Sequence, residues 1–345
     1  MTELYLYRQV TMEQRLSVRK EMMKNNVLIT SAGKRVSLTR KIMKELRLLI
    51  GDGRVYTCDM NPAMSPACVI SDGLFKVPPC TSEDYTDTLL TICIEHQIGL
   101  IVPTIDTELF ILSANKEYFL EQGICVVISD HDFVIRCLDK RKTSEFFVQH
   151  HIGIPEPRDK WNPVFPMFVK PYDGSLSANI HIIRKPEEMT VQIMSDPKLI
   201  FQEYIDRSEY KEFSVDMYYG RDHKVKCIVP RERLVVRAGE ISKGITRKNY
   251  LVSYLKERMG YIPGLIGCIC VQLFYRERDD NVVAFEINPR FGGGYPLSYC
   301  AGANFLKMMF LEYLLYEPQD YSDDWCDNTL MLRYDDEIIV YDTEA

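Results

Sequence analysis

The chain has 345 residues, which is enough for two or three domains with cores of ordinary size. Its 42 Lys and Arg against 49 Asp and Glu give a formal net charge of −7, which argues against a nucleic-acid-binding protein, because such proteins concentrate positive charge. The composition, 46% hydrophobic and 26% charged, is globular, and the sequence has no run of about eighteen apolar residues, which excludes a transmembrane helix.

The 11 cysteines are scattered singly, mostly within apolar runs. Cys268 and Cys270 have the spacing of neighbours on one face of a strand, and no second Cys or His pair completes a zinc site. The first apolar stretch also lies too deep for a secretory signal. We therefore expect reduced, buried thiols and a cytoplasmic protein.

The first part of the chain predicts a short extension and then an α/β domain. Residues 1–22 are polar, and the capping-box spacing of residues 11–14 predicts a helix over 13–24. Strand and helix signals then alternate: strands at 27–30, 54–59, 100–103 and 124–128, and helices at 36–49, 85–96 and 109–121. Continuous apolar strands separated by helices indicate a doubly wound parallel sheet over residues 23–130, with ligands beyond the carboxyl ends of the strands.

The second part, residues 131–330, is richer in strands and reads as an α+β domain. A helix is expected at 140–151, followed by strands at 167–170, 181–184, 199–203, 213–219, 225–229, 268–275 and 282–288. Further helices are expected at 187–195, 249–259 and 304–316. We assign residues 331–345 to a C-terminal tail.

The strongest chemical signal is a predicted hairpin over residues 271–288. A turn centred near Asp279 pairs Gln272 with Glu286, and strand alternation places Glu286 and Asn288 on one face while Phe285 and the other apolar residues face a core. Three oxygen-bearing side chains then converge, a set suited to Mg²⁺ and not to zinc or copper. A solvated polar hairpin face explains the same pattern about as well.

Arg290 follows this hairpin and is suited to gripping a phosphate group. Three consecutive glycines, residues 292–294, come next. Because such a run costs backbone entropy on folding, it favours a close approach to a ligand or a special backbone conformation.

Two weaker segments precede the hairpin. Lys170 ends an apolar strand and is followed by a loop of small residues that includes Ser175, which could cradle a polyphosphate, although the P-loop pattern is absent. Residues 199–205 could offer a strand edge to an adenine, with a carboxylate such as Glu212 for a ribose. Each segment alone is explained more simply as a surface loop or an edge strand.

Taken in order, these segments resemble the ATP-grasp superfamily, and within it the carbamoyl-phosphate-synthase large-chain branch with its small amino-acid ligases, such as the pyrrolysine-biosynthesis ligase. The likeness spans residues 26–316 and implies a pre-ATP-grasp domain followed by an ATP-grasp fold with a mobile lid at about 160–204. The segments that carry it are residues 139–140, 168–171, 202–205, 211–213, 271–274 and 285–290.

The resemblance also implies roles for individual residues. ATP would be the nucleotide and Mg²⁺ or Mn²⁺ the metal. Metal ligands would be Gln272, Glu286 and Asn288, and catalytic residues would be Arg290, Lys170 and Asn288. Nucleotide contacts would come from Lys140, Lys170, Ser175, Glu203, Ile205, Glu212 and, in a basic segment with Arg233 and Arg237, from Lys243. Leu176 and Ala178 stand where many relatives have glycine, and the chain has room for one such module where a carbamoyl phosphate synthase has two.

In the N-terminal domain, residues 30–35 with Asp59 invite a dinucleotide site, but one glycine is present where three are needed. The resemblance implies instead that strand ends contribute acceptor contacts, with Asp106 and Glu108 as candidates. Helix capping accounts for both acids equally well.

The expected function is an ATP-dependent ligase that activates a carboxylate as an acylphosphate and transfers it to an amine. The expected partners are small carboxylates and amines, without nucleic acid or membrane, and a homodimer is one assembly that these expectations allow. A carbamoyl-phosphate-synthase-like enzyme and a non-catalytic nucleotide-binding module remain open alternatives, with a nicotinamide oxidoreductase as a distant third.

Overall fold

The computed structural model describes residues 24–174, 179–237 and 239–341. The helix expected at 13–24 lies outside the described residues except for Lys24, and Ser175 of the predicted phosphate-binding loop also lies outside them. Among the described residues, no helix combines the length and the apolar character needed to cross a membrane.

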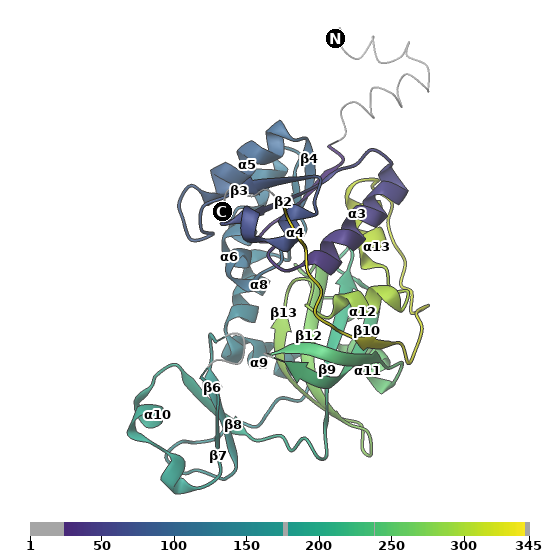
Figure 1. Ribbon diagram of the computed structural model, residues 1–345. Coiled ribbons are helices and arrows are strands. Elements are labelled where there is room, and N and C mark those ends of the chain that lie inside the picture. The colour runs from purple at the N-terminus through teal and green to yellow at the C-terminus, as the bar shows by residue number, and fades with distance from the viewer. Residues whose placement is uncertain (1–23, 175–178, 238, 342–345) are drawn as a thin grey trace, which may run out of the picture.

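The N-terminal domain is a five-stranded, all-parallel sheet in the order β3-β2-β1-β4-β5 (Figure 1), as the sequence predicts. Its strands are β1 (Asn26–Ile29), β2 (Val55–Asp59), β3 (Gly73–Lys76), β4 (Ile98–Val102) and β5 (Cys125–Val126). The edge strand β3 escaped prediction because its exposed positions break the apolar run. The connecting helices are α3 (Val36–Ile50), α4 (Pro66–Val69), α5 (Tyr85–Glu95), α6 (Asp106–Ala114) and α7 (Lys116–Leu120), with a 3₁₀ turn at Pro62–Met64.

Alternate residues of β1 enter two different cores, which is why helices cover both faces of this sheet. Val27 and Ile29 pack with α3 and with residues of the second domain, whereas Leu28 packs with α5 and α6. The helix α8 (His131–Leu138), which we did not predict, joins the domains, since Val134 lies in the N-terminal core and Phe133 in the next one. Helix α9 (Lys140–Gln149) follows where a helix was expected.

The second domain is built on a six-stranded antiparallel sheet in the order β13-β12-β9-β10-β11-β14. One face covers a core with α11 (Tyr250–Met259), and part of the other face packs against α12 (Tyr295–Cys300), α13 (Phe305–Tyr313) and the N-terminal domain. The strands are β9 (Lys211–Tyr219), β10 (Val225–Arg237), β11 (Glu240–Thr246), β12 (Gly267–Arg276), β13 (Asn281–Asn288) and β14 (Leu330–Leu332).

Two boundaries differ from the sequence prediction. Strand β10 continues well past Val229, so the basic segment at 231–248 is mostly a β-hairpin and not a loop. Strand β14 pairs with β11 across the expected start of the tail at residue 331, because its backbone groups complete the sheet edge.

A three-stranded sheet in the order β7-β6-β8 forms a separate projection, which Figure 1 shows at the lower left. It comprises β6 (Met167–Pro171), β7 (His181–Ile183) and β8 (Leu199–Glu203), with a 3₁₀ turn at Pro186–Glu188 and α10 (Val191–Ser195). Its small core is distinct from those of the two larger sheets. We refer to this unit as the lid sheet.

The cysteines are less uniformly buried than the sequence suggests. All 11 are free, but Cys300 and Cys326 are exposed and three others are only partly buried. Burial raises the pKa of the Cys270 thiol to about 12, and it also raises the pKa of Cys58 and Cys268, which keeps these thiols protonated and unreactive.

A buried ion pair explains the glycine run. Arg231 is 1% exposed, and its Nε and Nη2 donate to the two carboxylate oxygens of Asp216 at 2.7 and 2.6 Å. A Cβ atom on Gly294 would overlap Arg231 Nη1, while Gly294 itself has φ −94°, a conformation open to any residue. The glycine is therefore required by the close approach of Arg231, and not by a ligand or a left-handed backbone as we expected.

We predict that Gly294→Ala lowers the free energy of unfolding by about 2–3 kcal/mol, because the new methyl group displaces a buried guanidinium. Gly292→Ala is the matched control, since its Cβ would meet Cys270 Sγ at 3.3 Å and needs only a small adjustment. Urea denaturation of both variants measures the difference. Equal losses for the two alanines would contradict this account.

Candidate functional site

The predicted pairing of Gln272 with Glu286 is present on strands β12 and β13. However, the register shifts by one residue beside this pair, so that Leu273 pairs with Ala284 and Phe285 is an extra, bulged residue. Phe285 is only partly buried and stacks near Phe274 with a ring separation of 5.0 Å. Our placement of Phe285 in the core was therefore wrong, because the bulge turns it to the same side as Glu286.

Each oxygen of the predicted metal-binding trio lies near a cation. Glu286 Oε1 is 3.7 Å from Lys140 Nζ, and Gln272 Oε1 accepts a hydrogen bond from Arg233 Nη1 at 3.2 Å. Asn288 Oδ1 accepts from Arg290 Nη2 at 3.3 Å. One carboxylate and two amide oxygens on adjacent strands form an all-oxygen donor set, and this set fits Mg²⁺ or Mn²⁺.

Lys140 and Lys170 come from different elements and meet beside Glu286. Lys140, at the start of α9, donates to the carbonyl of Gly174 in the loop after β6. Lys170 on β6 is 7% exposed, and its Nζ lies 5.2 Å from the centre of the Phe285 ring. Burial lowers the pKa of Lys170 to about 8, with Lys140 adding to the effect and Glu286 opposing it. Two neighbouring ammonium groups with one carboxylate between them suit a polyphosphate.

The remaining nucleotide-site candidates lie at graded distances from this cluster. Glu212 on β9 is joined to it through Arg233, whose Nε is 3.2 Å from Glu212 Oε1, and it also pairs with Arg207 at 3.1 Å. Glu203, at the end of β8, accepts from the backbone N–H of Glu156 at 3.0 Å. Ile205 is partly buried just beyond that strand.

The basic segment divides into members that face the cluster and members that do not. Arg233 is the member that contacts it, whereas Arg237 is exposed and pairs with Asp335 at 3.2 Å. Lys243 is exposed on β11, four places from β13 in the sheet order, and within the described ranges no hydrogen bond or ion pair joins it to the cluster. The period-two spacing of Arg231 and Arg233 is the signal that could have singled out Arg233, had β10 been predicted at its full length.

The two acids after β4 have different environments. Glu108 is fully buried and accepts from Ser31 Oγ at 2.7 Å and from the Thr104 N–H at 2.7 Å, so it caps and stitches the strand ends. Burial raises its pKa, and these hydrogen bonds oppose the rise. Asp106, by contrast, pairs with Arg290 Nη2 at 2.6 Å and so links the N-terminal domain to the oxygen trio.

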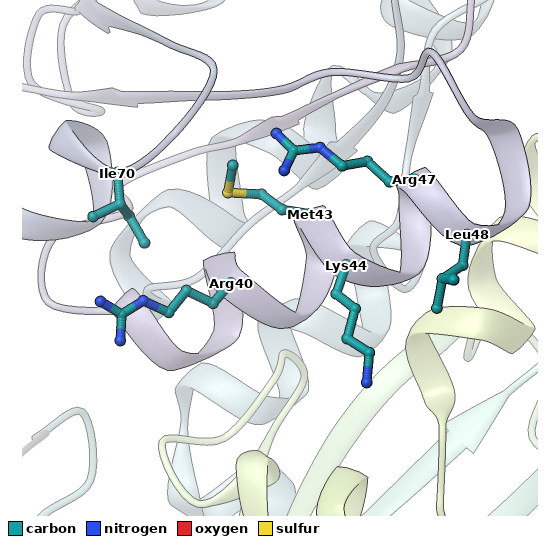
Figure 2. Close-up of a pocket in the computed structure, with 6 residues that line it drawn as sticks. All are labelled: Arg40, Met43, Lys44, Arg47, Leu48 and Ile70. Atoms are coloured by element: carbon teal, nitrogen blue, oxygen red, sulfur yellow. The ribbon is translucent and has the colours of Figure 1, made fainter.

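A separate concave surface lies on the outer side of α3 (Figure 2), lined by Arg40, Met43, Lys44, Arg47, Leu48 and Ile70. None of the cluster residues borders it. Arg47 there is already paired with Asp72 at 2.5 Å. The chemistry that the sequence predicts therefore lies elsewhere, between the large sheet and the lid sheet.

Comparison with known families matches both halves of the chain. Residues 27–127 match the family described as "PylC-like, N-terminal domain", and residues 195–330 match "ATP-grasp in the biosynthetic pathway with Ter operon". No functionally curated protein matches the chain in sequence.

Solved structures share the fold at low sequence identity. The biotin carboxylase domain of Hydrogenobacter thermophilus 2-oxoglutarate carboxylase, in complex with MgADP and bicarbonate, has 15% identity and a TM-score of 0.69, covering 90% of this chain and 74% of that one. The L-amino acid ligase of Bacillus licheniformis has 15% identity and a TM-score of 0.62, covering 84% and 74%. N5-carboxyaminoimidazole synthetase of Staphylococcus aureus, complexed with ADP, has 13% identity and a TM-score of 0.65, covering 89% and 79%.

With ADP as a probe, we predict that affinity falls about tenfold between pH 7 and pH 9, because Lys170, with its pKa of about 8, loses the proton that attracts phosphate. Lys170→Arg should flatten this dependence, since a guanidinium stays charged throughout. Calorimetric titration at several pH values measures both. An unchanged slope in Lys170→Arg would assign the titration to another group.

Proposed function

We propose that this chain, which belongs to the ATP-grasp superfamily, is an ATP-dependent ligase that joins a carboxylate to an amine through an acylphosphate. The observation that carries the proposal is the convergence of Lys140 and Lys170 on Glu286, beside Gln272 and Asn288. Cations for a polyphosphate and oxygens for a divalent metal thus occupy one face of one sheet.

The nucleotide would lie between the lid sheet and the large sheet. Its phosphates would contact Lys140 and Lys170, and the loop that includes Ser175 would lie over them. Phe274 and Phe285 form an adjacent aromatic wall, and Glu212 beyond it is suited to accepting hydrogen bonds from ribose hydroxyls. Glu203 and Ile205 would border the adenine, and Lys243 stays a candidate for the triphosphate or acceptor side.

The oxygen trio Gln272, Glu286 and Asn288 would hold Mg²⁺ or Mn²⁺. When bound, the cation would offset negative charge on the phosphate oxygens. Although Gln272 and Asn288 each accept one hydrogen bond from an arginine, an amide oxygen has a second lone pair that remains available to a metal.

The reaction would proceed in two displacements. First, a substrate carboxylate oxygen attacks the γ-phosphorus of ATP, the bond to the bridging oxygen breaks, and ADP leaves. Then the lone pair of a neutral amine attacks the acyl carbon, the C–N bond forms, and phosphate leaves with the electron pair of the C–O bond while the amine loses a proton to phosphate or solvent. Arg290 would hold the phosphate or acylphosphate, because its guanidinium lies beside Asn288.

The test is an ADP-release screen that pairs small carboxylates, bicarbonate included, with amino acids, other amines and ammonium. On an active pair, Glu286→Gln and Lys140→Met should lower kcat/KM by about 100-fold or more, because each removes charge stabilisation from the phosphoryl transfer. Lys142→Met and Glu257→Gln, on exposed positions of α9 and α11, are the matched controls and should leave turnover unchanged.

Wild-type turnover by Glu286→Gln would overturn the metal assignment. ADP release with bicarbonate and ammonium alone would favour a carbamoyl-phosphate-synthase-like reaction. Tight ADP binding without turnover on any pair would favour a non-catalytic nucleotide-binding module.

A further inference from the structure

A second polar junction lies at the point where the strand order of the N-terminal sheet reverses. In the order β3-β2-β1-β4-β5, successive strands leave the centre in opposite directions from β1 and β4, and the crevice beyond their carboxyl ends is where open α/β sheets bind ligands. Arg35, the N-cap residue of α3, follows β1, and its Nη2 donates to the carbonyl of Thr104, which follows β4, at 3.0 Å. Arg35 therefore spans this crevice.

The opposite wall comes from the second domain and the C-terminal segment. A Cβ atom on Gly293 would lie 3.3 Å from Arg35 Nη1, so the glycine loop touches this guanidinium. Arg333, just after β14, donates from Nη2 to the carbonyl of Gly293 at 2.6 Å and from Nη1 to Glu240 at 2.7 Å. The segment that we had assigned to a tail thus contributes a side chain to the junction.

The charges of this junction do not balance. Its two carboxylates are already paired, Asp106 with Arg290 at 2.6 Å and Glu240 with both Lys34 at 3.0 Å and Arg333 at 2.7 Å. In the described part of the chain, no carboxylate lies within 4.0 Å of the Arg35 guanidinium, whose one hydrogen bond goes to a backbone carbonyl. Burial lowers the pKa of Arg35 to about 10, and the like charge of Arg290 adds to the effect. A partly buried cation among other cations attracts an anion.

We infer that Arg35 binds a carboxylate group of the amine substrate, so that the acceptor of this ligase is an amino acid. The inference rests on the proposed function. Arg290 separates two zones, because its Nη2 contacts Asn288 of the oxygen trio on one side and Asp106 of the crevice on the other. Arg35 lies on the Asp106 side, away from the phosphate-binding lysines, so the carboxylate that it holds is not the one that is phosphorylated. An acceptor amino group then lies between Asp106 and Arg290, facing the acylphosphate.

The experiment compares amino acids with their carboxamides, which keep the amine and the side chain but lack the carboxylate. In the presence of ADP and Mg²⁺, calorimetric titration of the wild-type protein with a panel of L-amino acids identifies the tightest one, and its amide should bind about tenfold or more weakly. In Arg35→Gln the preference for the acid should disappear, while ADP affinity stays at the wild-type value and shows that the variant is folded. Arg35→Lys should restore part of the preference.

Arg40→Gln is the matched control, because Arg40 lies on the same helix, is exposed, and lines the outer surface of α3 (Figure 2). It should retain the full preference for the acid. Equal binding of acid and amide by the wild type, or an acid preference that survives in Arg35→Gln, would overturn the inference.

The ADP-release assay separates this inference from the proposed function. Turnover with ammonium or with amines that lack a carboxylate, but not with amino acids, would overturn the acceptor assignment and leave the ligase function standing. An Arg35-dependent acid preference without ADP release on any pair would support the binding site and contradict the ligase.

Discussion

The buried ion pair between Arg231 and Asp216 is the interaction on which the rest of the site depends. Arg231 donates to both carboxylate oxygens, and Ser298 Oγ donates to Asp216 Oδ2 at 2.6 Å, so one carboxylate ties β9, β10 and α12 together. Removal of either charge would leave the other buried and unpaired, at a cost of about 3–5 kcal/mol. Because the guanidinium occupies the space where Gly294 would carry a side chain, the loop after β13 rests directly on it. That same loop begins at Arg290 and presents the Gly293 carbonyl to Arg333, so the position of both arginines follows from the ion pair.

One face of the large sheet changes character along its strands, and this change places a domain interface and a polar cluster on the same framework. On β9, Tyr218 lies in the core shared with the N-terminal domain, Asp216 in the ion pair, and Glu212 beside Arg233. On β12, Cys268 packs into the shared core while Gln272 contacts Arg233. Period-two alternation keeps all these side chains on one face, while their neighbours fill the core on the other. The polar groups are thus held by strands whose ends are fixed in apolar cores.

Local patterns in the sequence predicted the sheets and the pairing of Gln272 with Glu286, because apolar runs and a symmetric turn are properties of neighbouring residues. The bulge at Phe285 was not predictable, since a turn centre sets one pair and leaves an extra residue in the strand undetermined. The glycine run was recognised as unusual, but its cause, a guanidinium on a distant strand, is a tertiary contact. Asp106 and Arg290 were both singled out, yet nothing in the sequence joined residues 184 positions apart into one ion pair. Arg35 and Arg333 gave no signal of their own, because each gains its meaning only where three segments meet.

The distribution of cores determines which part of this molecule opens at least cost. The N-terminal domain shares a continuous apolar core with the large sheet, α12 and α13, so separating the two would expose many fully buried side chains to water. The lid sheet has its own small core, centred on Met167 and Val169, which stays intact if the unit moves as a whole. Lys170 lies on this sheet, and its ammonium group is buried near Lys140 with only Glu286 to offset the two charges. A polyphosphate between the lysines would replace that repulsion with attraction, so the ligand that the site is built to hold is also the one that would draw the lid sheet towards the large sheet.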